Sequence, residues 1–142
     1  MVPIELAALR RHERTWSFMI EQTMQEITET EHVGEILIVT LGERMDAFSA
    51  PLLIEEFDQL LDEGAQHFVV DLSAVRIVDA DGDYPLLHLL KRAQATGGSV
   101  TLVCPPGNPI RIFYEMMHLD TLFDVVSSLD SPLLRPLLTP DD

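Results

Sequence analysis

Three carboxylates alternate with small residues in the run Asp79-Ala80-Asp81-Gly82-Asp83. Carboxylates at the first, third and fifth positions also begin a helix–loop–helix calcium site, which further requires Gly at the sixth position and Glu at the twelfth. Tyr84 and Leu90 stand at those two positions, so a site of that type is excluded. Weak binding of Mg²⁺ or Ca²⁺ by Asp79, Asp81 and Asp83 is a minor hypothesis, and we predict no dedicated metal site.

The other residues that could do chemistry do not form a catalytic pattern. Cys104 has no evident His partner in the sequence, which favours a small buried hydrophobe over a nucleophile. Gly97-Gly98 lacks the Lys and the Ser or Thr of a phosphate-binding loop. The histidines are scattered without metal-ligand spacing, at His12, His32, His67, His88 and His118. We therefore predict that the protein is not an enzyme and uses no cofactor.

The charge of the chain excludes two classes of partner. Among 142 residues, 24 Asp and Glu against 9 Lys and Arg give a formal net charge of −15. Such a charge repels nucleic-acid phosphates and anionic membrane surfaces. No apolar run is long enough to span a membrane, and charged residues interrupt the start of the chain where a secretory signal would lie. We expect a cytoplasmic protein that binds no nucleic acid and does not insert into a membrane.

Residues 1–23 differ in composition from the rest of the chain. They hold three bases and three acids, so the whole negative excess belongs to residues 24–142. We predict one domain at 24–142, preceded by an accessory segment at 1–23 that is dispensable for folding. The competing interpretation is an amphipathic helix that covers an exposed apolar surface or a dimer contact. Its apolar residues would be Ile4, Leu6, Leu9, Trp16, Phe18 and Ile20.

The domain alternates short apolar runs with helical patterns, which is typical of an α/β layer fold with mainly parallel strands. We predict strands at 25–31, 36–41, 67–72, 99–103 and 123–126, the first two joined as a hairpin. Phe68-Val-Val70 is a continuous apolar run, which indicates a strand covered on both faces.

Four helices are predicted between and after these strands. The first has Ser49 as its N-cap and stops at Gly64, and the second runs from about Asp83 to Thr96. The third opens at Asn108-Pro109, and a short fourth helix covers 129–138. The residues predicted to face the core are Leu53, Ile54, Phe57, Leu60 and Leu61 in the first helix, Leu86, Leu87, Leu90 and Ala93 in the second, and Ile112, Phe113, Met116 and Met117 in the third.

Four stretches of the sequence, taken in their order along the chain, form a recognisable pattern. They are Gly34–Asp46, Val69–Val75, Ile77–Gly82 and Leu119–Phe123. Together they resemble the STAS family, which includes bacterial anti-sigma factor antagonists and stressosome components. The resemblance covers roughly residues 24–138. It implies a single STAS-like α/β domain with a mixed, mainly parallel sheet of about five strands and about four helices.

The resemblance also assigns roles in the Asp79–Gly82 stretch. In the antagonists, an Asp, two small hydroxyl residues and a Gly follow one another, and a partner that is both anti-sigma factor and kinase phosphorylates the second hydroxyl. Asp81 stands at that phospho-acceptor position here. A serine kinase cannot modify it, and its single charge imitates phosphoserine only in part. A constitutive phosphomimic and a simple N-cap of the following helix are two compatible interpretations of Asp81.

By resemblance, the chain is a non-enzymatic protein-binding module whose partner-binding surface is Asp79, Ala80, Asp81, Gly82, Asp83 and Tyr84. The partner would be an anti-sigma factor of the histidine-kinase-like ATPase class or a related serine-kinase-like regulatory protein. Transcription would then change without contact between this chain and DNA. The alternative is a structural STAS subunit of a stressosome-like assembly or of a membrane transporter, with homo- or hetero-oligomers of STAS proteins.

Overall fold

The computed structural model describes residues 26–116 and 121–130. Its elements are β1 (Ile27–Val33), β2 (Ile36–Leu41), β3 (Arg44–Met45), α2 (Ala50–Asp62), β4 (His67–Asp71), β5 (Ile77–Val78), the 3₁₀ turn η1 (Ala80–Asp83), α3 (Tyr84–Ala95), β6 (Ser99–Val103), α4 (Pro109–Met116) and β7 (Asp124–Val126). The predicted accessory segment, Met117, and most of the predicted helix at 129–138 lie outside the described residues.

Five strands form a mixed sheet in the order β1-β2-β4-β6-β7. β1 runs antiparallel to β2, and every other neighbouring pair is parallel. The predicted mixed, mainly parallel five-stranded sheet is therefore confirmed. The two-residue strands β3 and β5 form a separate parallel pair that the sequence pattern did not predict.

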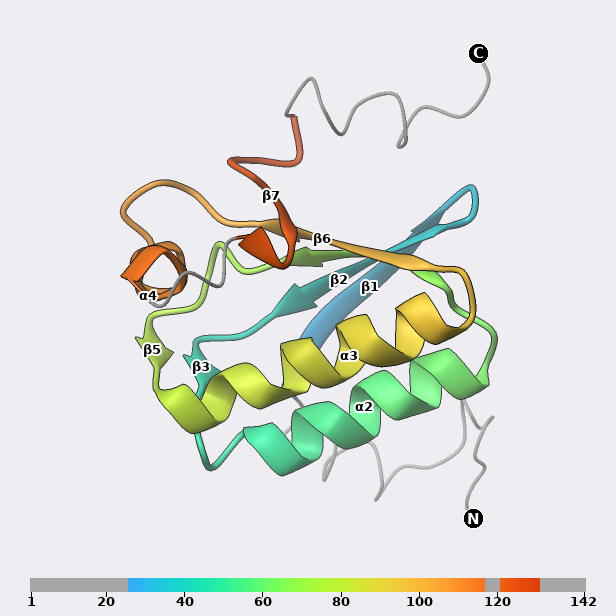
Figure 1. The fold of residues 1–142 in the computed structure, drawn as a ribbon, viewed down its shortest axis with the longest axis horizontal. Coiled ribbons are helices and arrows are strands. Elements are labelled where there is room, and N and C mark those ends of the chain that lie inside the picture. Colours follow the sequence, from blue (N-terminus) through green and yellow to red (C-terminus); the bar gives the residue numbers. More distant parts are fainter. Residues whose placement is uncertain (1–25, 117–120, 131–142) are drawn as a thin grey trace.

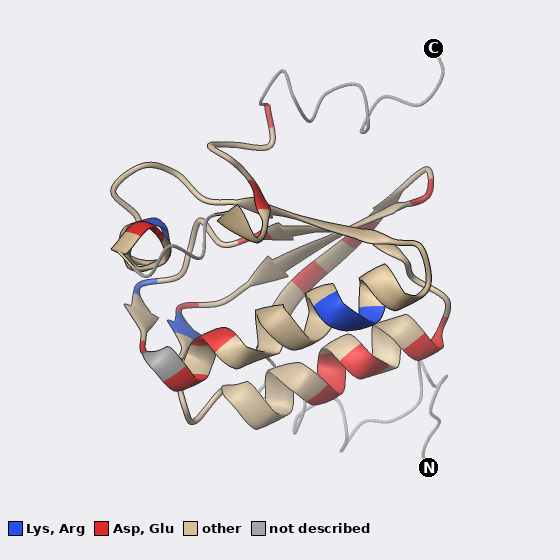
Figure 2. Ribbon diagram, viewed as in Figure 1, with Lys and Arg blue, Asp and Glu red and all other residues tan. Residues whose placement is uncertain are grey.

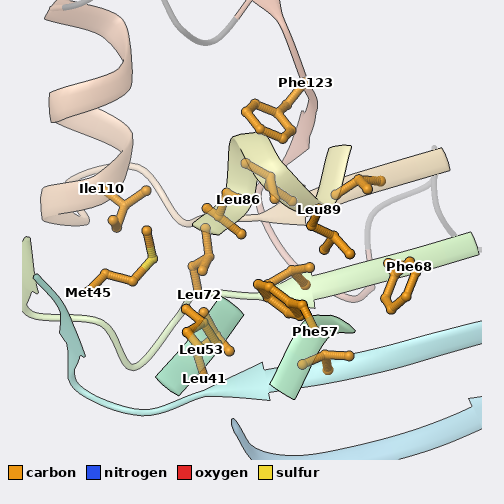
Figure 3. Close-up of a cluster of buried hydrophobic side chains, with 14 of the residues drawn as sticks. Leu41, Met45, Leu53, Phe57, Phe68, Leu72, Leu86, Leu89, Ile110 and Phe123 are labelled. Atoms are coloured by element: carbon orange, nitrogen blue, oxygen red, sulfur yellow. The ribbon is translucent and has the colours of Figure 1, made fainter. Parts of the chain in front are cut away.

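The main core lies between the sheet and two helices. α2 and α3 lie side by side on one face of the sheet (Figure 1). Phe57 from α2 and Leu89 from α3 meet strand residues such as Leu41 and Phe68 in one buried cluster (Figure 3). The opposite face carries a second buried cluster of Ile38, Val69, Val103 and Val126. Both faces of the central strands are thus apolar and covered, as the continuous apolar runs predicted.

The predicted ends of α2 and α3 agree with the structure better than the predicted core-facing residues of α3 do. Glycines with positive φ follow both, Gly64 at 109° and Gly97 at 85°, so the predicted stops are confirmed. The inward stripe of α3 includes Leu89, which is completely buried and was missed, whereas the predicted Leu87 and Leu90 are only half-buried. Among the described helices, none has the length and apolar character needed to cross a membrane.

Of the described residues of α4 that were predicted to face the core, only Phe113 packs against it, and it is half-buried. Ile110 and Tyr114 are buried, whereas Ile112 and Met116 are 47% and 73% exposed. The buried side chain of Asn108 fixes this orientation. Its Nδ2 donates to two carbonyl oxygens of the loop after β4, at 3.1 and 3.4 Å, and its Oδ1 accepts from the Ile110 N–H at 2.8 Å. The helix is anchored at its first turn, so Ile110 must point inward.

Phe57 and Phe48 offer a matched test of this core. Phe57 is completely buried and Phe48 is 85% exposed, although the two residues lie only nine positions apart. We expect Phe57→Ala to lower the free energy of unfolding by about 3–5 kcal/mol, because it removes a large buried side chain and leaves a cavity. Phe48→Ala should change it by no more than about 0.5 kcal/mol. Urea unfolding of both variants measures the difference, and equal losses would contradict the core assignment.

Candidate functional site

Two loops lie side by side at the end of the sheet where the parallel strands finish (Figure 1). The short β3–β5 pair joins them, and two hydrogen bonds extend the contact. The Asp79 N–H donates to the carbonyl oxygen of Met45 at 3.3 Å, and the Ala47 N–H donates to the Asp79 carboxylate at 3.4 Å. We call residues 46–49 and 79–84 together the two-loop site.

Gly82 packs directly on the backbone of β3. A Cβ atom at this position would lie 1.8 Å from the carbonyl oxygen of Met45, so only glycine fits without a shift of the strand. The Gly82 N–H donates to Oδ1 of Asp79 at 2.9 Å, and this bond caps the η1 turn that leads into α3. The interpretation of Asp81 as the cap is therefore wrong. Asp81 lies within the turn, is exposed, and makes no side-chain hydrogen bond with the described residues.

Asp83 is buried beneath this turn and only 4% exposed. It precedes α3, yet its carboxylate does not cap that helix. Within the described part of the chain, neither Asp83 Oδ1 nor the Tyr114 hydroxyl of α4 has a hydrogen-bond partner. Burial raises the pKa of Asp83, and the nearby Tyr114 hydroxyl opposes that rise only in part. Burial, together with the charge of Asp83, also raises the pKa of Tyr114. Burial thus disfavours the charged form of both groups.

Asp46 organises the other loop. Its Oδ1 accepts hydrogen bonds from the N–H groups of Phe48 and Ser49, both at 3.1 Å, and its Oδ2 accepts one from Arg44 Nε at 2.8 Å. Burial would raise the pKa of Asp46, but Arg44 and the two backbone donors outweigh it, so the pKa is lowered. The loop is tied down on both sides of Phe48, whose ring is left in solvent.

The structure also corrects the predicted start of α2. Ser49 occupies the residue before the helix, but its hydroxyl accepts from the Asp46 N–H at 3.0 Å and caps no helical N–H. Asp46 and Ser49 therefore bond to each other reciprocally. Sequence reasoning also missed Phe48 as a site residue, because one exposed aromatic side chain in a loop leaves no periodic pattern to detect.

The residues of the predicted partner-binding surface divide into two groups. Asp79, Asp81 and Tyr84 are exposed, whereas Gly82 and Asp83 are buried and shape the surface from below. Only the backbone of Ala80 is described. Across the described ranges, no three His, Cys, Asp or Glu side chains gather where they could hold a metal ion. The three carboxylates of this run do not converge, which removes the support for weak divalent-ion binding there.

Cys104 and His88, which could do chemistry elsewhere, contribute here to packing and to a surface cluster of charges. Cys104 is a buried free thiol, and burial raises its pKa to about 11, so it is not a thiolate at neutral pH. His88 Nε2 and Arg92 Nη1 both lie 2.7 Å from Oδ1 of Asp58. This cluster links the outer surfaces of α2 and α3.

Gly82 and Gly42 give a matched pair of substitutions. We expect Gly82→Ala to lower the free energy of unfolding by about 1–3 kcal/mol, because the new methyl group collides with the Met45 backbone. In Gly42→Ala the methyl group would lie 3.5 Å from a Thr28 methyl carbon, an ordinary contact, so the effect should stay within about 0.5 kcal/mol. Chemical denaturation of both variants tests this, and an unaffected Gly82→Ala protein would show that β3 and the turn are not tightly packed.

Asp83 should make stability depend on pH in a defined direction. Its pKa is raised above the ordinary value of 3.8, so the unmodified protein loses stability as pH rises from that value through the folded-state pKa. Asp83→Asn removes this loss and should be the more stable protein at pH 7, with the difference vanishing as pH falls below 3.8. Denaturation of both proteins across this range measures it. A difference that does not vary with pH would contradict a pKa of Asp83 that burial raises.

Comparisons with known proteins place this geometry in context. Several solved structures share the fold, among them the three that follow. Their sequence identities to this chain are too low to show more than the fold. One is a Thermotoga maritima protein assigned as an anti-sigma factor antagonist, 19% identical with a TM-score of 0.68, covering 79% of this chain and 95% of its own. An anti-sigma factor antagonist from Mycobacterium paratuberculosis is 21% identical with a TM-score of 0.65, covering 75% and 90% respectively. A Ser-to-Glu variant of RsbS from Moorella thermoacetica is 22% identical with a TM-score of 0.59, covering 77% and 95%.

A search of curated protein sequences finds no match to this chain. A family model for the STAS domain does match, over residues 28–131. That range includes every described strand except the first residue of β1, all three described helices and both loops of the two-loop site. The family-like stretches of the sequence, the five-stranded sheet and the family model agree. The chain belongs to the STAS domain family.

Proposed function

We propose that this chain is a non-enzymatic regulatory module that binds a protein partner through the two-loop site, as an anti-sigma factor antagonist does. The description of similarly folded proteins as anti-sigma factor antagonists supports this proposal. The partner is an anti-sigma factor of the histidine-kinase-like ATPase class. Binding takes place in the cytoplasm, and release of a sigma factor changes transcription while this chain touches no DNA.

The exposure of Asp81 is the observation that carries the proposal. Asp79 caps the turn and Asp83 is buried. Asp81, in contrast, is exposed and makes no side-chain hydrogen bond with the described residues. Its carboxylate faces solvent at the position where the family resemblance puts the phospho-acceptor hydroxyl. A fixed negative charge there imitates the phosphorylated condition in part. The chain therefore stays near the weakly binding state and does not pass through the usual phosphorylation cycle.

Capture of partners from the native cell tests the class of function. An ATPase with a kinase-like fold supports the antagonist role. Recovery of other STAS chains or of transporter subunits, with no such ATPase, would instead assign the chain to a stressosome-like or transporter assembly.

Asp81→Ser tests the role of the charge. We expect the variant to bind the ATPase about tenfold more tightly or better, because a like-charge repulsion is removed, and to become phosphorylated at residue 81. Stability should change by no more than about 0.5 kcal/mol, because the side chain is exposed. Titration calorimetry, labelling with ATP and thermal melting provide the three measurements.

Glu35→Ser is the matched control, because Glu35 is also an exposed acid and lies in the β1–β2 turn at the other end of the sheet. It should leave both affinity and labelling unchanged. Equal affinity of the Asp81→Ser and unmodified proteins would remove Asp81 from the binding surface. Loss of binding in Asp81→Ser would make the carboxylate a direct attractive contact, which is the opposite of a phosphomimic.

A further inference from the structure

The two-loop site presents two large aromatic side chains to solvent. Phe48 is 85% exposed and Tyr84 is 58% exposed. The Tyr84 ring also contacts the His88 ring, with centroids 6.2 Å apart, and His88 is bound to Asp58 of α2. Both rings therefore project from backbone that is fixed by hydrogen bonds or packing. Exposed aromatic side chains on a rigid frame are typical of a binding surface.

The packing of α2 against α3 shows how these side chains are arranged. His88 contacts Asp58, which precedes it by 30 residues. Tyr84 and Ile54, a half-buried residue of α2, each lie four residues before His88 and Asp58 on the same two helices. Phe48 lies in the loop that leads into the same end of α2. We call Phe48, Ile54 and Tyr84 the aromatic patch.

Exposed acidic residues occur on the same elements as the aromatic patch. Asp79 and Asp81 precede Tyr84 in the chain, and Glu55 follows Ile54 on α2. Figure 2 shows this distribution, with acidic residues in the turn before α3 and along α2. Arg44 of the adjoining strand β3 is already paired with Asp46. The surface therefore suits an occupant that combines apolar side chains with arginine or lysine.

The chain itself enters the described domain close to this patch. The carbonyl oxygen of Glu26 accepts from the Gly42 N–H at 3.1 Å, and the Glu26 N–H donates to the Glu56 carboxylate of α2 at 3.1 Å. Asp46 and Arg44 both act electrostatically on the Glu26 carboxylate, so Glu26 lies near the loop that carries Phe48. Glu26 thus lies at the end of the sheet where the two-loop site lies.

The N-terminal sequence has the chemistry that the patch requires. Trp16, Phe18 and Ile20 supply apolar side chains, and residues 10–14 hold three arginines against one glutamate, although residues 1–23 as a whole are neutral. Glu26 follows Trp16 by ten residues, a length of chain that spans about 30 Å when extended. A second copy of the chain is a poorer occupant, because two surfaces rich in carboxylates repel each other at a net charge of −15 per copy.

We propose that residues 1–23 fold back on the aromatic patch of their own chain, with apolar side chains near Trp16 against Phe48 and Tyr84 and the arginines beside Asp79, Asp81 and Glu55. This docking does not depend on the proposed function. Its regulatory consequence does rest on that function: the docked segment occupies the two-loop site and competes with the protein partner. The charge of Asp81, which disfavours the partner, favours the docked segment.

Trp16 makes the docking measurable without any partner, because it is the single tryptophan of the chain. In the full-length protein we expect blue-shifted emission and protection from acrylamide quenching. Phe48→Ala should shift the emission toward that of free tryptophan in water and raise the quenching constant, and high salt should act in the same direction. Ile112→Ala is the control, since Ile112 is also an exposed apolar residue but lies on α4. Thermal melting confirms that each variant is folded.

Three results would overturn the proposal. Emission of the unmodified protein that already resembles free tryptophan would show that the segment is not docked. Blue-shifted emission that Phe48→Ala leaves unchanged would place Trp16 on another surface. Emission that moves to longer wavelength on dilution would assign the contact to a second copy. Because no partner is present, each of these outcomes leaves the proposed function to be judged separately.

Discussion

The contact between Gly82 and the backbone of β3 is the constraint on which the two-loop site depends. A side chain at residue 82 would occupy the space of the Met45 carbonyl group, so the turn can sit on β3 only because residue 82 has none. In that position Asp79 reaches both the Gly82 N–H and the Ala47 N–H. Two loops that are more than 30 residues apart in sequence thus become one surface, and their exposed side chains have fixed relative positions.

Three carboxylates that alternate regularly in the sequence have three different environments in the fold. Asp79 is held by backbone N–H groups and stabilises the turn, Asp81 faces solvent, and Asp83 is buried near Tyr114 without a hydrogen bond to its Oδ1. Within five residues, solvent exposure therefore separates the structural carboxylate of Asp79 from Asp81, to which the proposed function assigns recognition of a partner. Of these three carboxylates, only Asp81 and the exposed part of Asp79 can reach a partner, and the exposed Tyr84 follows Asp81 by three residues.

The architecture was largely predictable from the sequence, because continuous apolar runs identify the buried strands and glycines mark the ends of α2 and α3. The site was less predictable, since it depends on contacts between distant segments. The cap falls on Asp79 instead of Asp81 because a turn that begins at Ala80 precedes the helix that the sequence pattern predicts from about Asp83. The buried face of α4 follows from the anchoring of Asn108, which no periodicity in that helix reveals. The β3–β5 pair is only two residues long and has no pattern of its own.

If the two-loop site is where this STAS module meets its partner, the backbone amides of that site must become protected in the complex. Amide hydrogen–deuterium exchange of the full chain, free and bound to the protein that it captures in its native cell, measures this directly. We predict slower exchange on binding in residues 46–49 and 79–84, with β1 and the β1–β2 turn unchanged. Slower exchange confined to β1 at the edge of the sheet, with both loops unaffected, would contradict the assignment of the site.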